Sequence, residues 1–562
     1  MTETVETAAV ETRPGATGRG RVPDILDVIA ALSSDAVPTP PLLARALLDL
    51  LPVEVWSNPD YRWLDPATKS GSILREVARR LMDGLAEWEP DPHARADHIL
   101  RKMLFGAGVT RVHAEMTRRS VYESRDATSD LSAVRFATVE GNLPFVQAEH
   151  DFPTNKQGRV SGSCRICGAP PTLERGLDRE NYAYAFIHGA YPKEEMADMR
   201  FDVIVGNPPY QIGLDDNTRA KPIYHHFIDR AIELDPKYLA MIVPSRWFTG
   251  GLGLDEFRER MIADRRLRVI VDNPKVFDCF PGVKIQGGVN YFLWDRDHDG
   301  DCEFSTRVDG NITSTAIRDL RDGEGVLIRD NKAVPIVAKV LARMSSSVEG
   351  LCSPTLPFGL RDNHPSSLKQ ADGDVPVIHG SFVGYVLKSS IAKNLDWVNR
   401  WKVLLPRAFG DTTQDDSGRP VFTVAGEPIA LAPGSVCTLT YVVAGLFDSQ
   451  DETENYAHYL ATKFVRFLVL QRKTTQDITP DRFRFVPALD MTRRWTDPDL
   501  YTHFGLTQEE IDYIEATIKP RSVNLSLDSP IPASHLKGGE KYREPGSRAT
   551  VEVSDDAEGD DE

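Results

Sequence analysis

The sequence predicts an α/β domain built on a mainly parallel sheet, followed by a second domain of the α+β class. Up to about residue 297, short apolar runs that end in turns alternate with amphipathic helical segments, the pattern of parallel strands joined by helices. After about residue 345, short aromatic and β-branched runs follow one another, and helical stretches come only near the end. The length of 562 residues, with 41% hydrophobic and 27% charged residues, is typical of a globular chain of two or three domains.

The first domain is expected over residues 23–340. Its apolar residues recur at helical spacing in two early segments, 25–32 and 40–51. A strand that runs into a turn is expected at 61–71, with an amphipathic helix directly after it at 72–85. The elements that follow are buried strands at 201–206, 238–248 and 287–297, and a helix at 221–234. A segment that contains glycine and cysteine, about 120–169, is expected as an insert between the first strand–helix unit and the strand at 201–206.

The second domain is expected over residues 345–520. Short strands are predicted within 375–387, 401–409, 418–424 and 437–447, and helices within 455–473 and 507–518. The two ends, 1–22 and 522–562, have the composition of disordered tails, and residues 552–562 carry seven acids and no base.

Composition excludes several classes of protein. No apolar run is long enough to cross a membrane, no secretory signal opens the sequence, and six scattered cysteines do not suggest a disulfide framework, so a cytoplasmic protein is expected. The net charge of −17 argues against a nucleic-acid partner for the chain as a whole. Residues 458–495, however, carry eight Lys or Arg against three acids. This segment is either a solvated face or a basic groove with phosphate contacts from Lys463, Arg466, Arg472 and Lys473.

The motif that most directly indicates chemistry is Asn207-Pro208-Pro209-Tyr210, at the end of a buried strand. The amino nitrogen of adenine is a poor nucleophile because its lone pair is delocalised into the ring. The Asn207 side-chain oxygen and the Pro208 carbonyl could accept both of its N–H hydrogens and favour attack on a methyl sulfonium. The prolines would hold that carbonyl in place, and Tyr210 would offer a flat face to a base extruded from the duplex. The alternative is a Pro-Pro turn with no function.

A second motif, residues 64–72, lies at a strand-to-helix turn. Small residues there let a ligand approach the backbone and the helix N-terminus, and Asp65 could bind the amino group of a zwitterionic ligand. By itself this motif is equally consistent with a ligand site and with an ordinary turn.

A third motif, Cys164-Arg165-Ile166-Cys167-Gly168, is half of a zinc-knuckle pattern. No second Cys-x-x-Cys follows, so His150 and either Glu123 or His188 would have to complete a structural zinc site. Two unrelated thiols near a turn are the alternative interpretation. No nuclease signature and no phosphate-binding GxxxxGK[ST] loop is found in the sequence.

In their order along the chain, Thr39-Pro40-Pro41, residues 65–72 (DPATKSGS) and residues 205–210 (VGNPPY) resemble the gamma-class N6-adenine DNA methyltransferases of restriction-modification systems. The resemblance extends from about residue 23 to 519 and implies a Rossmann-like methyltransferase domain followed by a target-recognition domain. It implies S-adenosylmethionine as methyl donor, adenine in double-stranded DNA as acceptor, and a restriction nuclease or helicase as partner. It also implies a cofactor site formed by Thr39, Pro40, Asp65, Ala67, Gly71 and Asn142.

Two positions depart from the pattern of this family. Lys69 stands where the cofactor turn usually has its first glycine, and the run 104–110 lacks the acid that usually binds the ribose hydroxyls, for which Glu115 is a substitute. The sequence therefore favours a site-specific adenine DNA methyltransferase. The alternatives are an amino-methyltransferase acting on RNA or on protein glutamine, and a DNA-binding specificity subunit with weakened catalysis.

Overall fold

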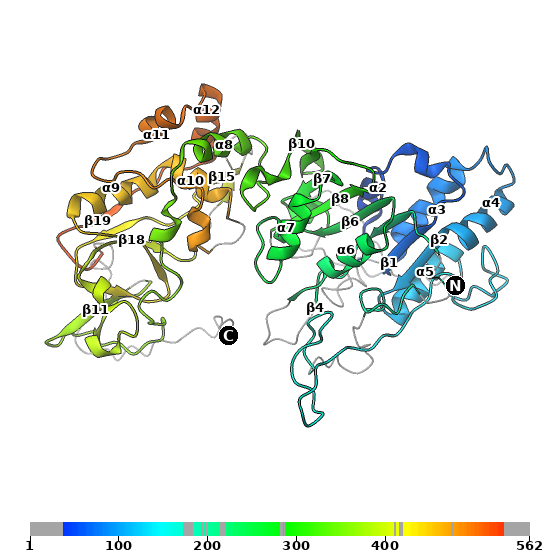
Figure 1. Cartoon of the computed structure of the whole chain (residues 1–562), viewed down its shortest axis with the longest axis horizontal. Helices are drawn as coiled ribbons and strands as arrows, with labels where there is room; N and C mark the ends of the chain where they lie inside the picture. Colours follow the sequence, from blue (N-terminus) through cyan, green and yellow to red (C-terminus); the bar gives the residue numbers. More distant parts are fainter. Residues whose placement is uncertain are drawn as a thin grey trace, which may run out of the picture.

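Two lobes lie side by side in the computed structural model (Figure 1). It describes residues 38–171, 184–192, 196, 199–212, 221–280, 285, 287–380, 382–409, 412–414, 420–473 and 477–532. The N-terminal tail expected at 1–22 and most of the C-terminal tail lie outside these residues. No helix within the described part of the chain has the length and apolar character needed to cross a membrane.

An eight-stranded mixed sheet forms the centre of the N-terminal lobe. Four strands at one side are parallel, and β8 runs antiparallel between β6 and β7. In spatial order the strands are β2 (Leu104–Gly108), β1 (Trp63–Thr68), β3 (Val203–Gly206), β6 (Tyr238–Pro244), β8 (Val289–Asp295), β7 (Leu267–Asn273), β9 (Cys302–Val308) and β10 (Asn311–Arg318). Trp63 of β1 stands opposite Leu104 of β2 on one side and Val203 of β3 on the other.

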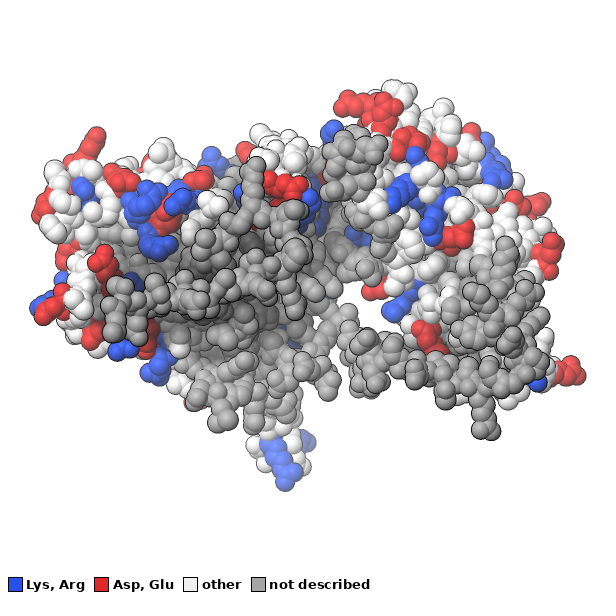
Figure 2. All heavy atoms as spheres, turned by 180° about the vertical axis from the view of Figure 1, so that it is seen from behind, with Lys and Arg blue, Asp and Glu red and all other residues white. Residues whose placement is uncertain are grey.

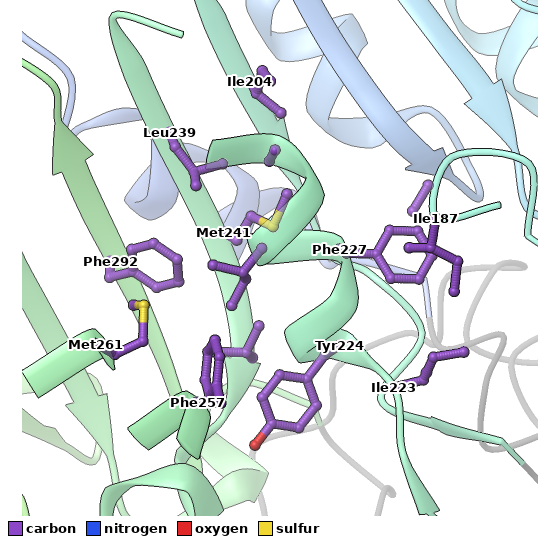
Figure 3. Close-up of a cluster of buried hydrophobic side chains, with 14 of the residues drawn as sticks. Ile187, Ile204, Ile223, Tyr224, Phe227, Leu239, Met241, Phe257, Met261 and Phe292 are labelled. Carbon is purple, nitrogen blue, oxygen red and sulfur yellow. The ribbon is translucent and has the colours of Figure 1, made fainter. Parts of the chain in front are cut away.

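Side chains alternate between the two faces of this sheet, and both faces are covered by helices. Trp63, Val205 and Ile242 pack in the cluster that contains α2 and α3, whereas Ile204 and Met241 pack in the cluster with α6 and α7, part of which Figure 3 shows. The helices of the lobe are α2 (Pro41–Leu48), α3 (Ser72–Gly84), α4 (Pro92–His98), α5 (Arg111–Tyr122), α6 (Tyr224–Glu233) and α7 (Asp255–Ala263). A Rossmann-like α/β domain is thereby confirmed.

Short elements complete the lobe. A two-stranded ribbon of β4 (Gln211–Ile212) and β5 (Lys221–Pro222) directly follows the Asn-Pro-Pro-Tyr motif. The short helical turns are η2 (Val53–Trp56), the π-helical η3 (Ile99–Met103), η5 (Ser245–Phe248), η6 (Val276–Asp278) and η7 (Leu320–Gly323).

The second lobe mixes small sheets with a layer of helices, so the expected α+β class is confirmed. One sheet joins β12 (Val383–Leu387), β11 (Asp374–Ile378) and β17 (Val436–Cys437), and another joins β18 (Tyr441–Phe447), β13 (Trp401–Pro406), β16 (Ile429–Leu431) and β19 (Asn524–Ser526). A ribbon pairs β14 (Thr412–Gln414) with β15 (Pro420–Phe422). The helices are α8 (Ala333–Arg343), α9 (Gln450–Ala461), α10 (Lys463–Leu470), α11 (Asp497–Phe504) and α12 (Gln508–Thr517), with turns η8 (Val348–Leu351), η9 (Lys388–Ser390), η10 (Leu395–Asn399) and η11 (Pro480–Phe483).

The expected boundaries of the second lobe need correction at both ends. Helix α8 precedes the expected start at 345, yet Ile336 and Val340 are buried in the same core as α9 to α12. An ion pair between Lys339 and Glu510 (2.6 Å) ties α8 to α12, so the lobes divide before α8 and not after residue 340. At the other end, β19 pairs with β16 in a stretch that was expected to belong to a disordered tail from residue 522.

Candidate active site

The point at which the strand order reverses lies between β1 and β3. From β1 the chain passes to β2 on one side, while β3 and β6 lie on the other. Ligands of open α/β sheets bind outside the carboxyl ends of the strands at such a point. Asp65 lies in β1, and Asn207 comes directly after β3.

A small pocket at this point brings together residues from three distant segments. It has a volume of about 10 Å³, room for about one water molecule, and is lined by Thr39, Asp65, Ala67, Lys69, Ser70, Gly71, Ser72, Ile73 and Asn207. Four of the residues expected at the cofactor therefore meet the first residue of the Asn-Pro-Pro-Tyr motif. Pro40 is adjacent, as the N-cap residue of α2.

The turn between β1 and α3 requires a glycine. Gly71 has φ +74°, and a Cβ on it would lie 3.0 Å from the Thr117 Cα atom of α5. The Ser120 hydroxyl donates to the Ser70 carbonyl (2.6 Å), so α5 holds the turn from behind. The start of α3 is thus fixed at the edge of the pocket.

The side-chain amide of Asn207 has a hydrogen-bond partner for its nitrogen but none among the described residues for its oxygen. The amide is 3% exposed, and its Nδ2 donates to the Thr39 hydroxyl (3.1 Å). The Thr39 carbonyl in turn accepts from the Ser72 hydroxyl (2.8 Å). The Asn207 Oδ1 is buried with no hydrogen-bond partner among the described residues. An acceptor in this state is ready for an N–H donor from a ligand, since a buried polar atom without a partner is unfavourable.

Tyr210 packs inward and does not form an open stacking platform. Its ring is 8% exposed and meets the Phe280 ring edge-on, with centroids 6.3 Å apart. Burial holds the pKa of its hydroxyl well above the ordinary value. The Ile223 N–H donates to the Tyr210 carbonyl (3.1 Å), which ties the motif to the start of α6. The expected flat face for an extruded base is therefore covered in this conformation.

Lys69 brings a positive charge into the pocket. The side chain is 6% exposed, and its Nζ lies 5.7 Å from the centre of the Tyr210 ring. Burial raises the pKa of Asp65 to about 7, although the Ala67 N–H (3.0 Å) and the charge of Lys69 oppose this rise. Burial, together with the same charge, lowers the pKa of His113 to about 4. The pocket thus already contains one cation beside a carboxyl group that is half-protonated near neutrality.

Two expected cofactor contacts are not found in this pocket. Asn142 was expected at the cofactor, but its Nδ2 donates to the carbonyls of Leu100 (3.2 Å), Arg101 (2.9 Å) and Leu104 (3.2 Å), at the end of the π-helical turn before β2. These bonds use the amide nitrogen of Asn142, and its expected contact with the cofactor stays a prediction. Glu115, the substitute for the ribose acid, lies on α5 and is not among the residues that line the pocket.

The expected metal ligands do come together, in the insert before β3. The ligand atoms of His150, Cys164, Cys167 and His188 all lie within 4.8 Å of one another. The fourth member is His188 and not Glu123, which ends α5 as its C-cap residue. The Cys-x-x-Cys turn closes through the Gly168 N–H, which donates to the Cys164 carbonyl (2.9 Å). Two thiols and two imidazoles form a set that suits tetrahedral zinc.

The four residues expected to contact DNA phosphates are instead used inside the second lobe. Arg466 is 1% exposed and donates to the carbonyls of Ala461 (3.1 Å), Thr462 (3.3 Å), Thr423 (3.1 Å) and Lys519 (2.6 Å). Arg472 is buried and donates to the Asp481 carbonyl (2.8 Å), and Lys473 donates to the carbonyls of Phe409 and Val424. Lys463 pairs with Glu515 (2.6 Å). The sequence shows that these residues are charged but not which groups they bind. The assignment of these four residues to DNA phosphates is therefore corrected.

Comparisons with known proteins agree with the expected chemistry. A family model described as Eco57I restriction-modification methylase matches residues 102–280. An "Uncharacterized adenine-specific methylase" of Mycoplasma pneumoniae is 35% identical over 322 residues, which cover 52% of this chain and 75% of that protein.

Several solved structures are more distantly similar. They include the type IIG restriction endonuclease BpuSI (11% identity, 88% of this chain and 61% of that chain, TM-score 0.34) and a DrdV–DNA complex (13%, 87% and 57%, TM-score 0.44). The EcoKI M protein of a type I restriction enzyme also matches (13%, 50% and 50%, TM-score 0.29). The chain thus spans between half and about three fifths of the length of these structures. The match to three quarters of the Mycoplasma protein shows that the chain belongs to the adenine-specific methylases, with a domain of the Eco57I restriction-modification type.

Proposed function

We propose that the chain transfers a methyl group from S-adenosylmethionine to N6 of adenine at specific sites in double-stranded DNA, as the modification component of a restriction-modification or anti-phage system. The observation that carries this proposal is the buried Asn207 Oδ1, which has no partner among the described residues and belongs to a residue that lines the same pocket as Asp65. An acceptor fixed at the switch point of the sheet suits a planar amino group.

The residues of the motif would act by hydrogen bonding and not by covalent chemistry. Asn207 Oδ1 and the Pro208 carbonyl accept the two N–H hydrogens of the adenine amino group, which draws the nitrogen out of conjugation with the ring. Thr39 acts as a positioning residue, because its hydroxyl binds Nδ2 (3.1 Å) and so turns Oδ1 toward the substrate. S-adenosylmethionine would supply a methyl group on a sulfonium, so that the new N–C bond would replace the S–C bond and leave a neutral thioether. Asn207 and the Pro208 carbonyl would hold the amino nitrogen for this transfer, and the proton released from nitrogen would pass to solvent.

The cofactor would lie across the turn between β1 and α3, where it supplies an electrophilic methyl group. Asp65 accepts its amino group, Gly71 permits close approach to the backbone, and the N-terminus of α3 favours its carboxylate. The pocket of about 10 Å³ is far smaller than the roughly 300 Å³ at the lower end of ligand sites. Lys69 lines this space, so a cofactor that enters it would lie against the lysine side chain.

We also propose a structural zinc ion in the cluster of Cys164, Cys167 and His150, with His188 as the fourth ligand. Cys167 Sγ and His150 Nδ1 are 3.3 Å apart, a distance that suits two ligands of one ion. Metal analysis of the purified protein should give about one zinc per chain, and Cys164→Ser should lose it. A protein purified without chelators that contains no zinc would contradict this assignment.

The experiment that tests the proposed function is transfer of labelled methyl from S-adenosylmethionine to duplex DNA, followed by nucleoside mass spectrometry. We expect label in N6-methyladenine and its loss in Asn207→Ala, with cofactor binding retained by calorimetry. Asn311→Ala, at an exposed asparagine on β10, serves as the matched control. Cofactor binding without label in any DNA would shift the assignment to RNA or protein glutamine. Absence of both would indicate a specificity subunit that binds DNA without modifying it.

A further inference from the structure

The insert before β3 carries a hairpin that projects from the catalytic lobe, drawn in cyan in Figure 1. We infer that this hairpin, residues 150–168, is a metal-stapled clamp that holds the DNA backbone through Lys156 and Arg159. The inference rests on the proposed DNA substrate and concerns a surface that is separate from the pocket.

Backbone hydrogen bonds shape the tip of the hairpin. The Asn155 N–H donates to the Arg159 carbonyl (2.8 Å), and the Asn155 side-chain oxygen accepts from the N–H of Gln157 (3.0 Å) and of Arg159 (3.0 Å). Gly158 supplies the left-handed residue of the turn at φ +73°. The Ser161 N–H donates to the Pro153 carbonyl (2.8 Å) and closes the two arms. The tip therefore has a definite shape and presents its side chains outward.

The base of the hairpin is fixed to the catalytic lobe at the four-ligand cluster. His150 precedes the tip and the two cysteines follow it, while His188 comes from a separate segment. That segment packs on α6, since the rings of Tyr184 and Phe227 lie 5.6 Å apart, and Ile187 lies near Phe227 in Figure 3. Because α6 begins beside the Tyr210 carbonyl, an ion in the cluster would fix the hairpin relative to the catalytic motif.

The charge of the hairpin is opposite to that of the chain. Residues 150–168 contain Lys156, Arg159 and Arg165 against one acid, Asp151, in a chain with a net charge of −17. Figure 2 shows Lys and Arg on the projecting tip and no acidic side chain there in that view. Arg165 pairs with Asp151 (2.9 Å), whereas Lys156 and Arg159 are exposed and make no ion pair with any described residue. These two cations are thus available to a polyanion, unlike the buried cations of 458–495.

A DNA backbone is the partner that this surface suits. Apart from Val160, which is 49% exposed, the exposed side chains of the tip are cationic or polar, and those around Lys156 and Arg159 include Thr154, Asn155, Gln157 and Ser161. Such groups bind phosphate oxygens and carry little base information, so the hairpin would add affinity and orientation and not sequence specificity. Each phosphate contact contributes about 0.9 to the slope of log affinity against log salt concentration.

The test measures binding of a fluorescent DNA duplex by anisotropy over a range of salt concentrations. The double variant Lys156→Ala/Arg159→Ala is compared with wild type and with Lys102→Ala/Arg119→Ala, which removes two exposed cations elsewhere on the same lobe. We expect weaker binding and a salt slope reduced by about 2 for the hairpin variant only. Its affinity for S-adenosylmethionine and its methylation rate at saturating DNA should equal those of wild type. Equal slopes for the two double variants would overturn the inference.

A second arm tests the metal staple. Cys164→Ser should lose bound zinc and, at the same time, lose DNA affinity to the extent seen for the hairpin variant, while it still binds S-adenosylmethionine. Loss of zinc with unchanged DNA affinity would overturn the role of the cluster. Failure of the proposed function has a different signature, since wild-type protein would then methylate no DNA at all.

Discussion

Replacement of Lys69 by methionine should change which form of the cofactor the pocket prefers. The substitution keeps a long side chain and removes the charge that lies 5.7 Å from the Tyr210 ring. S-adenosylmethionine carries a sulfonium charge, whereas its product S-adenosylhomocysteine has a neutral thioether in the same place. Because the methyl group has to reach an amino nitrogen at Asn207, its sulfur would lie close to the Lys69 ammonium.

The size of the effect follows from the charges. Lys69 and Asn207 line one small pocket, so we take the two positive charges as about 4 to 8 Å apart; at an effective dielectric constant of about 20 they repel by about 2 to 4 kcal/mol. Movement of the lysine and solvent screening reduce this repulsion, so we expect about 1–3 kcal/mol, or roughly a 5- to 150-fold effect. The ratio of the two dissociation constants removes the contribution of the groups that both ligands share, since the ligands differ only in the methyl group on sulfur and its charge.

The assay is calorimetric titration of wild type, Lys69→Met and Lys102→Met with both ligands. The dissociation constant of S-adenosylmethionine relative to that of S-adenosylhomocysteine should fall by about tenfold in Lys69→Met and stay unchanged in Lys102→Met, whose charge is exposed. A ratio that is the same in all three proteins would refute the reasoning, and would mean that Lys69 leaves the pocket entirely when ligand binds.

Four further predictions concern the pocket and the second lobe. Burial raises the pKa of Asp65 to about 7. The affinity for S-adenosylmethionine should therefore increase as pH rises from about 6 to 8, because the carboxylate that accepts its amino group then predominates. Titrations of Asp65→Asn should show no such change. In the unbound protein the folded state holds this proton and the unfolded chain loses it near pH 4, so stability should fall as pH rises toward 7, a trend that thermal unfolding of Asp65→Asn should lack. Thr39→Val should lower the methylation rate about 10- to 100-fold with little change in cofactor affinity, because Asn207 loses the partner that orients it, and an unchanged rate would rule out this positioning role. Arg466→Met should destabilise the second lobe by about 3 kcal/mol in urea unfolding because buried carbonyls lose their donor, without altering the salt slope of DNA binding that a phosphate contact would alter.

Local pattern was enough to predict much of the catalytic lobe. Apolar runs that stop at Asp65-Pro66 and at Asn207-Pro208 place both motifs at strand ends, and neighbouring parallel strands present those ends on one edge of the sheet. Gly71 follows from the same logic, since a tight strand-to-helix turn needs a left-handed residue. The sequence likewise predicted that Cys164 and Cys167 lie close together, because the Cys-x-x-Cys spacing alone allows one ion to contact both.

Other features depend on partners that lie far away in the chain. Arg466 looks like a surface cation in a basic segment, yet its guanidinium satisfies carbonyls 43 and 53 residues away. Asn142 looks like a ligand contact, yet it satisfies carbonyls at the end of a helical turn. The sequence shows which charged and amide residues are present. Whether such a side chain is free to bind a ligand depends on the backbone atoms that packing brings to it, because buried polar groups need hydrogen-bond partners. The same reason decides the state of Asn207: packing supplied a partner for its nitrogen and left its buried oxygen without one among the described residues.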